Sequence, residues 1–72
     1  MKQKEIAILY SYISHRRVAL EHEVSIRRAN LRYRDVDIVD CYELASALQQ
    51  LETFIEFSNH VLAILNLKPI KR

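Results

Sequence analysis

The strongest constraint on the fold is a regular apolar pattern in the second half of the chain. Steps of three and four residues alternate through Cys41, Leu44, Leu48, Leu51, Ile55, Ser58, Leu62 and Leu65. This alternation places the side chains on one face of an α-helix, as in the seam of a coiled coil. It predicts a helix over residues 38–66, which Asn66 and the following Lys68-Pro69 would end. Ala47, Phe54 and Val61 widen the same apolar face.

Apolar and aromatic residues also recur at helical spacing in the first half. They are Ile6, Leu9, Tyr10, Ile13, Leu20, Val24 and Leu31. This spacing predicts a helix over residues 3–30, ended by Asn30, which can adopt the left-handed conformation common at helix ends. The chain contains no glycine and one proline, so it lacks the residues that tight β-hairpin turns require. We therefore expect an all-α fold in which two helices of about 40 Å form an antiparallel hairpin.

Two aspartates mark the start of the second helix. Asp37 and Asp40 can each cap a helix N-terminus, and Asp40 with Glu43 three residues later resembles a capping box. Residues 67–72 follow the second helix as a short basic tail. We treat residues 1–72 as a single helical-hairpin domain.

The arginines of the first helix lie on both edges of its apolar stripe. Eleven residues make close to three helical turns, so Arg16 lies over Arg27, and Arg17 over Arg28. In a hairpin that turns near residue 35, facing residues have numbers that sum to about 70. Arg27 should then lie near Glu43.

The same register places Arg16 or Arg17 near Glu52 or Glu56. Residues 1–34 carry eight Lys or Arg and three Glu, whereas residues 35–66 carry six acids and no Lys or Arg. We therefore expect basic and acidic side chains to meet along the two helices.

Three arginines near the turn are less well partnered than the others. Together with the tyrosine between two of them, they are the candidate nucleic-acid contacts: Arg28, Arg32, Tyr33 and Arg34. Tyr33 stands between two arginines, so its ring is a candidate for stacking on a base. The sequence has no glycine-rich phosphate loop and no recognisable recognition helix that would read bases. RNA or DNA binding through phosphates near the turn is thus an alternative function.

The apolar surface of the two predicted helices exceeds what one hairpin can bury. The first helix carries a second stripe away from its main seam, and the face of the second helix is wider than one neighbour covers. A chain this short buries only about 60% of its surface on folding. We expect a homodimer that forms a four-helix bundle. Its interface should contain Ile8, Tyr12, Ala19, Ile26, Phe54 and Val61, and the polar Ser58 in the seam should fix the pairing register.

Metal, redox and membrane roles have weaker support. His15 and His22 lie seven residues apart, about 10 Å along a helix, which is too far to share an ion, so we expect no metal or cofactor. Cys41 is the single cysteine; it fits a reducing compartment, and its place in the seam predicts a buried thiol. The longest run without Asp, Glu, Lys or Arg is eleven residues, against roughly 20 for a membrane span. We expect a cytoplasmic protein.

A hairpin without long loops offers no pocket in which catalytic groups are held in register, so we expect neither an enzyme nor a small-molecule substrate. The sequence favours a noncatalytic, homodimeric adaptor or regulator that binds another protein. The alternatives are the RNA- or DNA-binding regulator and a structural subunit of a hetero-assembly.

Overall fold

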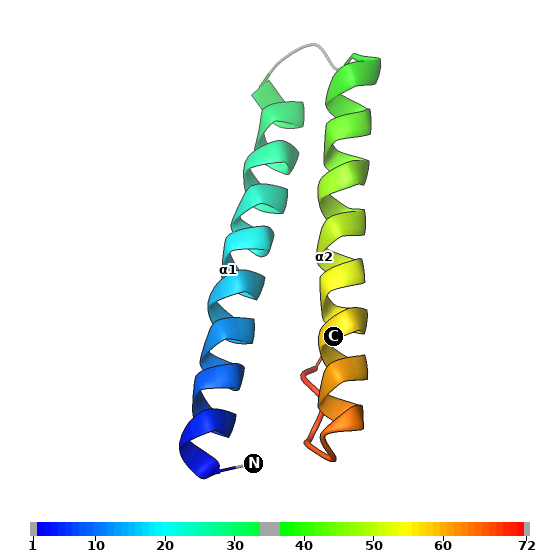
Figure 1. Ribbon diagram of the computed structural model, residues 1–72. Helices are drawn as coiled ribbons and strands as arrows, with labels where there is room; N and C mark the ends of the chain where they lie inside the picture. Colours follow the sequence, from blue (N-terminus) through cyan, green and yellow to red (C-terminus); the bar gives the residue numbers. More distant parts are fainter. Residues whose placement is uncertain (1, 34–36, 72) are drawn as a thin grey trace.

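The chain folds into two long helices that run side by side in opposite directions (Figure 1). The structure is a computed structural model that describes residues 2–33 and 37–71. Helix α1 spans Gln3–Tyr33 and helix α2 spans Ile38–Ile64, and the described residues form no strand. The molecule is a rod of 51 × 17 × 15 Å. The predicted all-α antiparallel hairpin is confirmed.

The two ends of α2 have different capping groups. At the start, the Asp37 side chain accepts a hydrogen bond of 2.8 Å from the backbone N–H of Asp40. Asp37 is therefore the N-cap, and the capping box predicted for Asp40 and Glu43 is wrong, because Asp40 already lies in the first helical turn. At the other end, Leu67 N–H donates to Leu62 C=O at 2.8 Å and Asn66 N–H donates to Ala63 C=O at 3.1 Å. This pair of bonds forms a Schellman motif.

The left-handed asparagine is Asn66, with φ 59°, and not Asn30. The predicted end of the first helix at Asn30 is wrong, since α1 continues to Tyr33. Leu31 lies seven residues after the buried Val24 and is itself half-buried, so the apolar stripe that holds α1 against α2 extends beyond Asn30.

The core is a narrow line of side chains between the helices. Among the described residues, the buried apolar side chains are Ile13, Val24, Ala47, Ile55 and Leu62, and Leu62 is fully buried. Ser58 is buried in the same line, and no buried side-chain nitrogen or oxygen in the described part of the chain lacks a hydrogen-bond partner. The register role of Ser58 stays a prediction.

The seam of α2 gradually leaves the core toward the turn. At seven-residue steps, Leu62 and Ile55 are buried, Leu48 is half-buried and Cys41 is exposed. A straight α-helix drifts by about 20° per heptad relative to a strict seven-residue repeat, so each step moves the side chain further from the partner helix. The prediction of a buried Cys41 is therefore wrong.

Candidate interaction surface

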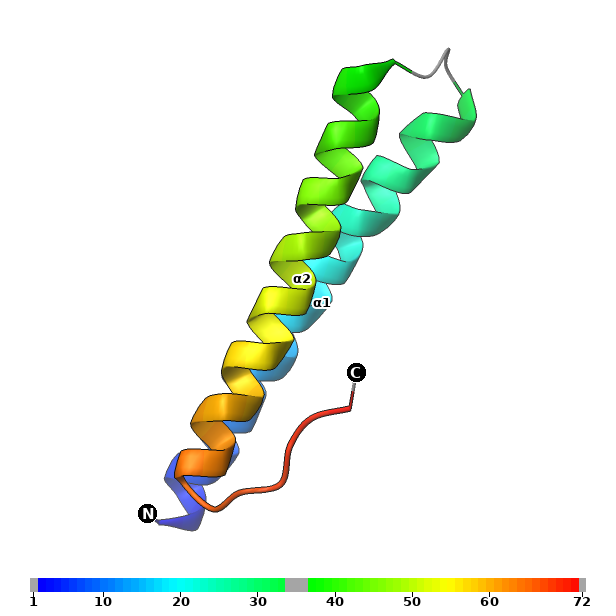
Figure 2. The same cartoon turned by 90° about the vertical axis from the view of Figure 1, so that its right-hand side faces the viewer.

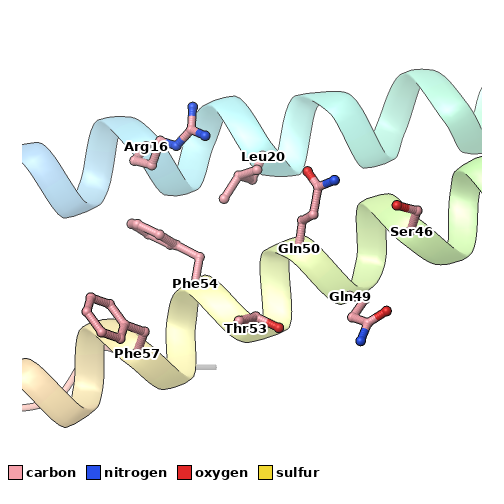
Figure 3. A pocket seen from close by; sticks show the side chains of 8 residues that line it. All are labelled: Arg16, Leu20, Ser46, Gln49, Gln50, Thr53, Phe54 and Phe57. Carbon is pink, nitrogen blue, oxygen red and sulfur yellow. The ribbon is translucent and has the colours of Figure 1, made fainter.

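A groove between α1 and α2 runs along one side of the hairpin. Its middle part has a volume of about 560 Å³ and is lined by Arg16, Leu20, Ser46, Gln49, Gln50, Thr53, Phe54 and Phe57. Figure 3 shows Phe54 and Gln50 pointing from α2 toward α1, with Leu20 pointing back toward α2. Arg16 lies on α1 above Phe54, where the long stem of an arginine can cover apolar surface.

The groove continues in both directions from this middle part. Toward the chain termini, a hollow of about 310 Å³ shares Arg16, Phe54 and Phe57 with the middle part and adds Leu9, Tyr12, Ile13, Ser58 and Val61. Toward the turn, a hollow of about 170 Å³ shares Ser46 and Gln50 and adds Glu23, Arg27, Tyr42, Glu43 and Ala47. We call this continuous surface the groove face.

Large apolar side chains remain uncovered along the groove face. Tyr12 is 64% exposed and Phe57 is 65% exposed, while Phe54 and Val61 are half-buried. Aromatic side chains contribute more apolar contact area than other residues. The part of the groove nearest the termini is therefore its most apolar part.

The predicted second stripe of α1 adjoins this groove. Ile8, Ala19 and Ile26 are exposed, and they fall on the side of α1 that Tyr12 occupies because they are spaced from it by four, seven and fourteen residues. All six predicted interface residues thus lie on or beside the groove face.

Sequence reasoning missed Phe57 as a member of this surface. Phe57 lies three residues after Phe54 and four before Val61, which is the spacing of one helix face. The signal was present in the sequence, but the alternation of the main seam passes through Ile55 and Ser58 and leaves Phe57 out.

An ion pair between Arg27 and Glu43 joins the two helices at the end of the groove nearest the turn. Arg27 Nη1 lies 2.7 Å from Glu43 Oε2, and Arg27 Nε lies 2.9 Å from Glu23 Oε1. The predicted pairing of Arg27 with Glu43 is confirmed. Arg17 Nε lies 3.8 Å from Glu21 Oε2 within α1. These side chains are partly exposed, so each pair contributes about 0–1 kcal/mol, and the pair of Arg27 with Glu43 favours this alignment of the two helices.

The candidate nucleic-acid contacts lie outside the groove. Arg28 and Arg32 are exposed, and together with Ser25 and Ala29 they line a shallow hollow of about 190 Å³ on α1. Within residues 2–33 and 37–71, neither arginine forms an ion pair. Arg34 and the side chain of Tyr33 lie outside the described residues.

The geometry of the described residues gives little support for a catalytic, metal-binding or membrane-spanning role. Ser11 Oγ and His15 Nδ1 are 3.5 Å apart on exposed α1. No group of three or more His, Cys, Asp or Glu in the described part of the chain could hold a metal ion. Within the same residues, neither helix combines the length and apolar character that crossing a bilayer requires.

The hairpin has more accessible surface than its mass predicts. Its surface is 5935 Å², whereas a compact monomer of 8.5 kDa exposes about 4,650 Å². Its radius of gyration is 15.4 Å, against about 11 Å for a compact domain of this length. The chain therefore exposes about 1,300 Å² more surface than a compact monomer of its mass.

No protein family model matches the chain, and neither a curated protein nor a solved structure matches it.

Proposed function

We propose that this protein is a noncatalytic helical hairpin that acts as a homodimeric adaptor or regulator and works by binding another protein. The observation that carries this function is the excess of about 1,300 Å² of surface in one chain. A standard stable interface buries about 800 Å² per partner, so the excess is large enough for one such interface.

A second copy of the chain is the occupant that we propose for the groove face. Tyr12, Phe54, Phe57 and Val61 form an apolar strip that draws on both helices. When two such strips meet about a two-fold axis, each hairpin covers the other, and the four helices enclose a common core. The stripe of Ile8, Ala19 and Ile26 then extends the interface along α1.

The adaptor or regulator role follows from the remaining surface of such a dimer. The outer sides of both hairpins stay accessible, so the bundle presents two identical copies of every outer surface to a partner. The lone cysteine fits a reducing compartment, and we propose the cytoplasm as the location.

Light scattering coupled to size-exclusion chromatography tests the dimer directly. Two chains of 8.5 kDa give a mass of about 17 kDa, and we expect this mass at micromolar concentrations. A folded species with the mass of one chain at about 100 μM would remove the basis of this function. Dimers with an interface of standard size are already formed well below that concentration.

RNA or DNA binding is the second candidate function, favoured by one observation. Arg28 and Arg32 are exposed four residues apart without an ion pair among the described residues, so their charges are available to phosphates. A mobility-shift titration over a salt series tests it. Phosphate contacts make the affinity fall log-linearly with salt, and replacing both arginines by glutamine should lower that slope by about 2. No retardation at low salt would dismiss nucleic-acid binding.

A further inference from the structure

The C-terminal tail does not extend away from the hairpin but turns back along it. Figure 2 shows residues after α2 running back along the rod, toward its middle. The tail contacts α1 at Tyr10 and Arg17 and α2 at Asn59. On α1, Tyr10 and Arg17 lie on the opposite edge of the buried stripe from Tyr12 and Arg16, which line the groove. The tail therefore occupies the side of the hairpin opposite the groove face.

The hydrogen bonds that Tyr10, Arg17 and Asn59 make to residues 68–71 all go to the tail's main chain. Tyr10 Oη donates to Lys68 C=O at 2.5 Å, and Arg17 Nη1 donates to Lys71 C=O. The Asn59 side chain donates through Nδ2 to Ile70 C=O at 3.2 Å and accepts through Oδ1 from Ile70 N–H at 2.8 Å. Main-chain groups are the same in every peptide, so these contacts recognise an extended conformation rather than a particular sequence.

Asn59 acts toward the tail as a neighbouring β-strand would. Its carboxamide pairs with both the N–H and the C=O of one residue, which is the exchange made between hydrogen-bonded residues of antiparallel strands. Pro69 disfavours the helical conformation for Lys68 and so keeps the segment extended. Leu67 and Ile70 are half-buried and supply the apolar contacts.

The surroundings of Asn59 match a basic ligand with apolar side chains. Glu52 and Glu56 lie seven and three residues before Asn59, on the same side of α2, and the tail brings Lys68 and Lys71 to this side. Beginning one turn before Asn59, a hollow of about 220 Å³ is lined by Leu48, Leu51, Glu52 and Ile55. The acidic side chains favour basic residues, and the hollow has room for a further apolar side chain.

We propose that this side of the hairpin is a binding site for an extended basic peptide of a partner protein, and that residues 67–71 occupy the site in cis. Asn59, Tyr10 and Arg17 hold the main chain of the peptide, and an apolar residue takes the place of Ile70. The tail competes with the incoming peptide at an effective concentration on the order of millimolar, so it sets the affinity that a partner must exceed. The site is on a different side from the groove face, and it does not depend on whether the chain dimerises.

An NMR titration of the full-length chain tests this site. The probe is a synthetic peptide with the sequence of residues 66–71, acetylated and amidated, and the readout is the backbone amide signals of the α2 residues around Asn59, which every variant retains. In the Ile70→Asp variant, which weakens the cis tail, we expect a saturable shift. In the wild-type chain the apparent Kd should rise about fivefold, as expected when a few mM of effective concentration competes at a site of about 1 mM affinity.

Two further variants separate peptide binding from nonspecific contact. Asn59→Ala in the Ile70→Asp chain should abolish saturable binding, because it removes both main-chain hydrogen bonds. Gln49→Ala is the matched control, since Gln49 is an exposed amide of α2 that lines the groove instead, and it should leave the Kd unchanged. The inference is overturned if the peptide produces no saturable shift in the Ile70→Asp chain, or if it binds equally well after Asn59→Ala.

Discussion

Replacing Phe57 by alanine tests whether the groove face joins two copies of the chain. Phe57 lines the groove but is 65% exposed in the single chain. Alanine is the best helix former, so the change should preserve α2. An effect on association would then come from the lost side chain at the interface and not from unfolding of the hairpin.

The expected magnitude follows from the exposed area. A phenylalanine presents on the order of 200 Å², of which 65% is exposed here, so trimming it to alanine removes about 100 Å² of apolar surface per copy. At about 25 cal/mol per Å², full burial of this area contributes about 2.5 kcal/mol per copy and about 5 kcal/mol per dimer. If half of the area is buried in the dimer, the loss is about 2.5 kcal/mol, which raises the Kd about 60-fold.

Sedimentation equilibrium over a concentration series measures this change, and circular dichroism checks that the helix content is retained. Val18→Ala is the matched control, because Val18 is 61% exposed on α1 but is absent from the groove lining. It should change the Kd less than about threefold. Equal weakening by both variants, or no weakening by Phe57→Ala, would refute the assignment of the groove face as the dimer interface.

Three other substitutions probe the hairpin itself. Leu62→Ala removes the fully buried side chain and should lower the free energy of unfolding by about 2–5 kcal/mol in a urea titration; a loss below about 1 kcal/mol would contradict the described core. Asp37→Ala should cost about 1 kcal/mol in thermal unfolding, whereas Asp37→Asn, which keeps a capping oxygen, should cost much less. Glu43→Gln should lower the free energy of unfolding by less than about 1 kcal/mol, because its pair with Arg27 is partly exposed. This loss should shrink in high salt, and a salt-independent loss would show that the pair is not screened.

The architecture could be predicted because its signals are local and repeated. The apolar seam of α2 extends over seven turns, and one irregular residue such as Ser58 does not break it. Asp37 was one of two candidate caps, and the facing pair Arg27 and Glu43 followed from simple hairpin register. The predicted interface residues follow from the same periodicity, and their role in a dimer stays a prediction.

The features that escaped prediction depend on small geometric differences or on distant contacts. Cys41 belongs to the heptad pattern, but the accumulated drift of a straight helix carries it away from α1. Asn30 and Asn66 have the same intrinsic tolerance for the left-handed conformation, but Leu31 after Asn30 is half-buried, and α1 continues to Tyr33. The tail contacts join Tyr10 to Lys68 and Asn59 to Ile70, and no periodic pattern in the sequence encodes them.

The exposed position of Cys41 provides a labelling site for measuring the distance between two associated hairpins. The thiol lies in the first turns of α2, at one end of a rod 51 Å long, and it is the single cysteine of the chain. Spin labels attached there would be close together in a bundle whose turns meet at one end, and separated by nearly the full rod in a bundle whose turns point apart. One pulsed dipolar measurement on the unmutated chain thus reads the relative direction of two associated hairpins.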